Sequence, residues 1–142
     1  MDENAPLNID EDLHLAYEQC HYRMLVPGLE LRIGSSSRGV DNYLAELCAE
    51  QLIIITAFNP GSKIVTGETN RRQNFRLYDT IRRTGYNCNY GINQTEDESW
   101  PSEDTFWVFD VPLETAVAWG QTFGQVAIVH YPKGGLAQLV YC

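Results

Sequence analysis

The sequence lacks the features that mark most exported, membrane-bound and metal-binding proteins. Its first residues hold no basic region followed by an apolar run, so no secretory signal or transit peptide is expected. The longest apolar run, Leu52 to Phe58, is too short to span a bilayer. The four cysteines lie far apart without a C-x-x-C pair, which argues against a zinc site or a redox dithiol. We therefore expect a cytoplasmic protein with reduced thiols, no membrane contact and no metal.

Positive charge is also scarce. The 142 residues carry 10 Lys and Arg against 19 Asp and Glu, a formal net charge of -9. Such a field repels phosphate backbones, which argues against a nucleic-acid partner. The arginines between Arg71 and Arg83 spread around one helix and favour a solvated face over a basic patch. No phosphate loop of the G-x-x-x-x-G-K type and no nucleophile paired with a base can be read from the spacing, so no cofactor is implied.

What is present is the composition of one globular domain. Hydrophobic residues make up 44% of the chain and charged residues 20%, and 142 residues suit a single core. We expect one domain over residues 1–142, with residues 1–9 as a flexible acidic tail. The periodicity predicts helices at 10–20, 40–49 and 67–84 and from 112 to about 123, with strands at 22–26, 29–33, 52–58, 86–90, 105–109, 126–131 and 136–141.

Turn and cap residues separate these elements. Pro27-Gly28 and Pro60-Gly61 suit the centre of type II turns, and Ser35-Ser36-Ser37 offers caps for the second helix. Gly85 and Gly124 suit the left-handed residue that follows a helix. Residues 91–104 are polar and acidic and are expected to form a connection.

From residue 52 the order is strand, helix, strand, strand, helix, strand. This order favours an α+β sandwich of the ferredoxin-like, split βαβ kind, preceded by a helix and a hairpin. The alternative is a three-layer, doubly wound α/β sheet. In that case the helix at 40–49, which also precedes the central strand, covers the second face of the sheet.

Several short segments occur in an order typical of one family. They are Ala16-Tyr17, Leu31-Arg32-Ile33-Gly34, Thr56-Ala57-Phe58-Asn59-Pro60-Gly61-Ser62, Asn70, Trp100-Pro101-Ser102-Glu103 and Phe123-Gly124-Gln125-Val126-Ala127-Ile128. Together they resemble the bacterial family known as domain of unknown function 3293, over nearly the whole chain. The resemblance implies a bacterial or phage origin and a cytosolic location, and it implies no activity.

The candidate site follows from where this topology places polar residues. Asn59 and Ser62 come directly after the central strand, and Asn70 and Asn74 start the apolar stripe of the next helix. A plain turn and internally satisfied amides explain these residues as well as ligand binding does. In a ferredoxin-like sandwich they share one edge with the segment from Trp100 to Glu103.

Gln125, at the start of the strand near 126, belongs to the same edge. The start of the helix at 67–84 offers unpaired N–H groups there, which suit a phosphate or carboxylate. Trp100 suits stacking on a ring or plugging the core, and Glu103 is the only candidate acid or base.

Two functions remain open. The first is a site, catalytic or not, for a small anionic or nucleotide-like ligand. Its residues are Asn59, Ser62, Asn70, Asn74, Trp100, Glu103 and Gln125. The second is a non-catalytic interaction module in which the acidic segments 2–18 and 96–104 contact a basic protein partner. The second function predicts that internal hydrogen bonds fill the polar edge and leave no pocket.

Overall fold

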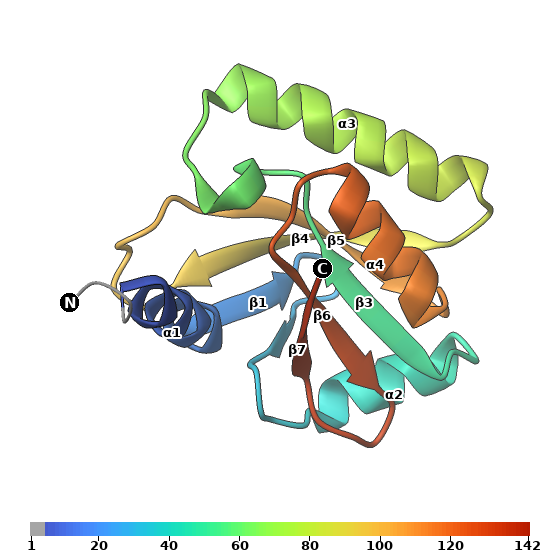
Figure 1. Ribbon diagram of the computed structural model, residues 1–142. Coiled ribbons are helices and arrows are strands. Elements are labelled where there is room, and N and C mark those ends of the chain that lie inside the picture. The colour runs from blue at the N-terminus through green and yellow to red at the C-terminus, as the bar shows by residue number, and fades with distance from the viewer. Residues whose placement is uncertain (1–4) are drawn as a thin grey trace.

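The computed structural model describes residues 5–142, with side chains from residue 12 onward. Helices and strands alternate irregularly along the chain (Figure 1). The elements are α1 (Ala5–Glu18), β1 (Cys20–Met24), β2 (Leu29–Leu31), α2 (Arg38–Glu46), β3 (Gln51–Ile55), the 3-10 turn η2 (Pro60–Ser62), α3 (Gly67–Arg83), β4 (Cys88–Thr95), β5 (Glu103–Phe109), α4 (Leu113–Thr122), β6 (Ala127–Pro132) and β7 (Gln138–Tyr141).

One sheet organises these described residues. Its strand order is β2-β1-β4-β5-β3-β6-β7, and each neighbouring pair is antiparallel. The expected α+β class is confirmed. The alternative of a doubly wound sheet is wrong, because such a sheet is mostly parallel.

The sheet curls until its two edges approach each other. Beyond β2, the Gly34 N–H donates to the Ala137 carbonyl at 2.8 Å, and the Ala137 N–H donates to the Ser35 carbonyl at 2.9 Å. These bonds join the segment after one edge strand to the segment before the other. These bonds close the curl on that side of the inner face.

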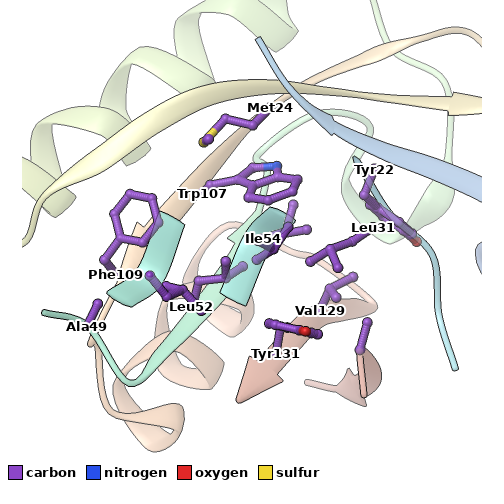
Figure 2. Close-up of a cluster of buried hydrophobic side chains, with 13 residues drawn as sticks. Tyr22, Met24, Leu31, Ala49, Leu52, Ile54, Trp107, Phe109, Val129 and Tyr131 are labelled. Atoms are coloured by element: carbon purple, nitrogen blue, oxygen red, sulfur yellow. The ribbon is translucent and has the colours of Figure 1, made fainter. Parts of the chain in front are cut away.

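Alternating residues of the strands form two separate cores. On β3, Leu52 and Ile54 belong to the core inside the curl, and Ile53 and Ile55 belong to the core on the opposite face. Figure 2 shows the inner core, where the buried Trp107 lies beside Ile54. A strand that is apolar on both faces is covered on both, which explains the continuous apolar run at 52–55.

Helices cover both faces. α3 and α4 pack on the outer core through residues such as Leu77 and Trp119, and α2 packs on the inner core through Val40 and Leu44. Figure 1 shows α3 and α4 on one side of the sheet and α2 on the other. The helix expected at 40–49 therefore covers the second face of the sheet, as the three-layer alternative predicted, but the sheet is antiparallel.

Local signals placed most helix ends correctly. The Ser37 hydroxyl accepts from the Val40 N–H at 3.1 Å and caps α2, as expected. Gly85 and Gly124 follow α3 and α4 with φ of 89° and 70°, which is the left-handed region expected for them. α1 begins at Ala5 and ends at Glu18, so residues 5–9 of the expected tail are helical, while residues 1–4 lie outside the described residues.

Two local expectations are wrong. β4 runs over Cys88–Thr95 and so includes the first part of the segment expected to be a connection. It pairs with β1 on one side and β5 on the other, so its backbone is satisfied although few of its side chains are apolar. The turn between β1 and β2 is not type II, because Gly28 does not adopt the positive φ which that turn requires.

Candidate functional site

A cavity lies between α1 and the inner face of the curled sheet. Its volume is about 150 Å³. Leu13 and Tyr17 of α1 line one side of it, and Ile54, Val129 and Leu139 of the sheet contribute apolar surface. The polar part of its lining comes from the residues after β3, from the segment that leads into β5, and from the start of β6.

The turn after β3 brings Asn59 to the cavity. The Ser62 N–H donates to the Asn59 carbonyl at 2.9 Å, and Gly61 has φ of 68°, as the third residue of a type II turn requires. The turn expected here is confirmed. Asn59 itself is left-handed, with φ of 48°, a conformation that asparagine tolerates better than most residues.

Asn70 of α3 holds this turn in place. Its Oδ1 accepts from the Asn59 N–H at 2.8 Å, and its Nδ2 donates to Asn59 Oδ1 at 3.0 Å. Asn59 Oδ1 also accepts from the Val65 N–H at 3.1 Å. Since Asn59 and Asn70 are both buried, these bonds satisfy polar groups that water does not reach.

Asn74, one helical turn later, holds the end of β3. Its Oδ1 accepts from the Ala57 N–H at 2.9 Å, and its Nδ2 donates to the Asp104 carbonyl at 3.3 Å. The Thr56 hydroxyl donates to the same carbonyl at 2.6 Å. These bonds tie α3, the segment after β3 and β5 together behind the cavity.

The segment before β6 packs against the same turn. The Gly61 N–H donates to the Gly124 carbonyl at 2.7 Å, and Gln125 Nε2 donates to the Phe58 carbonyl at 3.0 Å. A Cβ at Gly124 would lie 2.9 Å from Pro60 Cβ, closer than real side chains approach. This close approach and its positive φ both call for glycine at position 124.

Among the described residues, Glu103 is the only acidic residue of the lining. Its Oε2 accepts from Asn59 Nδ2 at 2.8 Å and from the Trp100 indole N–H at 3.0 Å. Burial raises the pKa of the Glu103 carboxyl above its usual value, and the two hydrogen bonds oppose that rise. Within residues 12–142 no hydrogen bond joins the other oxygen, Oε1, to the protein.

α1 closes the cavity through a few polar contacts. The hydroxyls of Tyr17 and Ser62 lie 3.0 Å apart, and His14 Nδ1 lies 2.6 Å from the Tyr141 hydroxyl of β7. Burial raises the pKa of the Tyr17 hydroxyl, so it is neutral near pH 7. Burial also raises the pKa of the Cys20 thiol to about 11, which keeps this lining residue protonated.

A lining residue that sequence reasoning missed is Asn93 of β4. Its Oδ1 is buried and accepts no hydrogen bond from the described residues. Asn93 was overlooked because residues 91–104 were expected to be a connection. Strand alternation through Tyr90, Gly91 and Ile92 was the signal that would have placed it on the sheet.

The structure brings the predicted residues together but divides them into two groups. Those that line the cavity are Asn59, Ser62, Trp100, Glu103 and Gln125. Asn70 and Asn74 lie behind it, and all their hydrogen bonds described above are to the protein. The first turn of α3, expected to attract an anion, does not line it either. A binding role for these residues stays a prediction.

Within the described residues, no group of three or more His, Cys, Asp and Glu side chains is placed to hold a metal ion. No helix in the same part of the chain is both long and apolar enough to cross a membrane.

Comparison with protein families matches the middle of the chain. The family model described as "Protein of unknown function (DUF3293)" matches residues 55–128, which run from the end of β3 to β6. No curated protein and no solved structure matches the chain. The matched span includes the turn at Asn59, both asparagines of α3, Glu103 and Gln125.

Proposed function

The chain belongs to the DUF3293 family of proteins of unknown function, and from that premise we propose that it binds a small molecule in the cavity beneath α1. The ligand is neutral or positively charged and about the size of one ring. The observation that carries this proposal is the buried Glu103 carboxyl, which Asn59 and Trp100 hold in a cavity that no basic side chain of residues 12–142 lines.

Size and polarity both support a ring-sized ligand. Apolar protein cavities of about 150 Å³ hold a molecule such as benzene. Here the lining combines the apolar surface of Ile54, Val129 and Leu139 with a few polar groups, a combination that orients a ligand with one apolar and one polar end.

The charge of the lining favours a neutral or cationic ligand over the anionic or nucleotide-like one expected from the sequence. No Lys, Arg or His of the described residues lines the cavity, and Glu103 repels an anion when it is ionised. The chain as a whole carries a formal charge of -9, which adds to this repulsion.

The hydroxyl pair in the lining supports binding rather than nucleophilic catalysis. Ser62 has the neutral Tyr17 hydroxyl as its partner, and a phenol with a raised pKa is a poor base for activating a serine. Glu103 is the only carboxyl among the described lining residues, and its role in catalysis would be proton transfer to or from a bound ligand.

The interaction module stays the competing function, and the cavity counts against it. That function predicts a polar edge filled by internal hydrogen bonds. The amides of Asn70 and Asn74 are filled in this way, but a hollow remains in front of them.

We also propose that β3 to β6 form a split βαβ unit of the ferredoxin-like kind. In support, β5 lies between β3 and β4, which a helix connects, and β6 lies on the other side of β3. β1, β2 and β7 are then additions at the two edges.

The test is a ligand titration with a blocked cavity as control. Two-dimensional NMR of the protein follows the Trp100 indole N–H while benzyl alcohol, indole, benzoate and adenosine monophosphate are added. We expect benzyl alcohol or indole to shift this signal saturably and the two anions to leave it unchanged.

Ala127→Leu puts extra carbons into the cavity, and Ala45→Leu makes the same change on the exposed face of α2. The first variant is expected to lose the response and the second to keep it. If neither benzyl alcohol nor indole binds the unaltered protein, the proposal is wrong, and the interaction module becomes the better hypothesis.

A further inference from the structure

We infer that the ligand presents two N–H donors from one edge, as an amidine, a guanidine or an aminopyridine does, to Glu103 and Asn93. This inference rests on the proposed function and adds the chemical class of the ligand. It comes from two hydrogen-bond acceptors on neighbouring strands that line the cavity and receive no hydrogen bond from the described residues.

The sheet places the two acceptors next to each other. Asn93 of β4 and Glu103 of β5 are direct partners in the antiparallel register. Directly opposed residues project from the same face, with Cβ atoms about 4.5–5.5 Å apart. Both residues line the cavity, so their side chains meet the same ligand.

Each side chain has an acceptor that the described residues leave open. Glu103 Oε2 accepts from both Asn59 and Trp100, and no described residue donates to Oε1. Asn93 Oδ1 is buried, with no hydrogen-bond partner among the described residues. Buried acceptors are paired in nearly all folded proteins, so the buried, open Asn93 Oδ1 beside Glu103 in a cavity indicates a ligand that donates.

The donors must belong to one compact group. An amidinium carries N–H donors on both of its nitrogens, one for each acceptor, and its charge makes the hydrogen bond to the carboxylate a charge-assisted one. A phenol or alcohol has one O–H and leaves one acceptor unpaired. No described lining residue has a basic side chain, so none competes with a positively charged ligand for the Glu103 carboxylate.

The surrounding bonds keep Glu103 ready for this role. Asn59 and Trp100 hold Oε2 from two directions, and Asn70 in turn holds Asn59. The carboxyl therefore does not have to be reoriented when the ligand enters, which lowers the entropic cost of binding.

The test compares ring compounds that differ only in their polar group. Benzamidine, benzamide, benzyl alcohol and benzoate are titrated into the full chain, and the Trp100 indole N–H is followed by NMR. We expect benzamidine to bind about tenfold more tightly than benzyl alcohol and benzoate not to bind. Benzamide, which has donors but no charge, is expected to fall between them.

Variants separate the contributions of the two acceptors. Glu103→Gln is expected to weaken benzamidine about tenfold and benzyl alcohol much less, because it removes the charge and keeps the shape. Glu46→Gln makes the same change on exposed α2 and is expected to have no effect. Asn93→Asp keeps an acceptor and is expected to bind benzamidine at least as tightly as the unaltered chain, whereas Asn93→Leu is expected to bind it more weakly.

The outcomes distinguish this inference from the proposed function. If benzyl alcohol binds and benzamidine binds no more tightly, the inference fails and the proposed function stands. If Glu103→Gln weakens the binding of all ring compounds equally, Glu103 supports the cavity but does not distinguish ligands by their donors. The inference then also fails. If no ring compound binds the unaltered chain, both are wrong.

Discussion

Replacing Asn70 by alanine removes the side chain that fixes the turn carrying Asn59. The Asn59 N–H loses its acceptor in a site that is 4% exposed, which costs about 1–3 kcal/mol. Asn59 Oδ1 loses one donor but keeps the Val65 N–H, so this second loss adds only about 1 kcal/mol. Alanine is the better helix former by a few tenths of a kcal/mol, roughly, which offsets part of the loss.

We therefore expect Asn70→Ala to lower the free energy of unfolding by about 2–3 kcal/mol. Urea unfolding followed by tryptophan fluorescence measures this loss, and Arg76→Ala, on the exposed face of the same helix, serves as the control with a change below about 0.5 kcal/mol. A loss below about 0.5 kcal/mol in Asn70→Ala would show that Asn70 does not hold the turn.

The same variant has a second, independent readout at Glu103. When the turn loosens, Glu103 loses the donor Asn59 Nδ2, and this bond is one of those that lower the pKa of the carboxyl. The pKa of Glu103 is expected to rise in Asn70→Ala, measured from the carboxyl ¹³C shift during a pH titration. An unchanged pKa together with a large loss of stability would mean that Asn70 supports the helix and not the cavity.

Three other changes test separate parts of the site. Because burial raises the pKa of Glu103, the folded chain binds that proton more tightly than the unfolded chain, and stability is lost as pH rises through the window from the unfolded to the folded pKa. Stability curves from about pH 4 to about pH 8 are therefore expected to show Glu103→Gln gaining on the unaltered protein as pH rises, and a constant difference would contradict the raised pKa. In urea unfolding, Gly124→Ala is expected to lower the free energy of unfolding by about 1–2 kcal/mol more than Gly134→Ala does. Both glycines have positive φ, but only a Cβ at position 124 would lie against Pro60. Equal losses in the two variants would show that the contact with Pro60 is relieved without cost. Iodoacetamide at about pH 8 is expected to modify the exposed Cys48 well before Cys20, whose pKa is about 11, and peptide mass spectrometry showing Cys20 modified first would refute its burial.

Local signals were sufficient where a residue's role depends on its neighbours in the chain. The turn at Asn59 to Ser62, the cap at Ser37 and the glycines after α3 and α4 all lie where the sequence predicted them. Each depends on backbone angles or hydrogen bonds within a few residues, so the residue types carry the information.

The same reasoning failed at β4, and the failure has a physical cause. A strand is predicted from apolar residues that alternate with polar ones. In β4 the positions that face into the curl are Asn89, Gly91, Asn93 and Thr95, and part of this face lines a cavity instead of a dry core. The polar residues that made β4 resemble a connection thus include those that make part of the cavity lining polar.

The sequence by itself determined the α+β class, most of the elements, and the group of polar residues worth following. Only the tertiary structure decided which of them meet a cavity. Asn59 and Glu103 lie on separate elements, and they come together because β5 pairs with β3. Asn70 and Asn74 face the core as their spacing predicted, but their amides are hydrogen-bonded to Asn59, to the Ala57 N–H and to the Asp104 carbonyl. Periodicity tells which way a side chain points, whereas the packing of distant segments decides whether a partner or an open space is there to meet it.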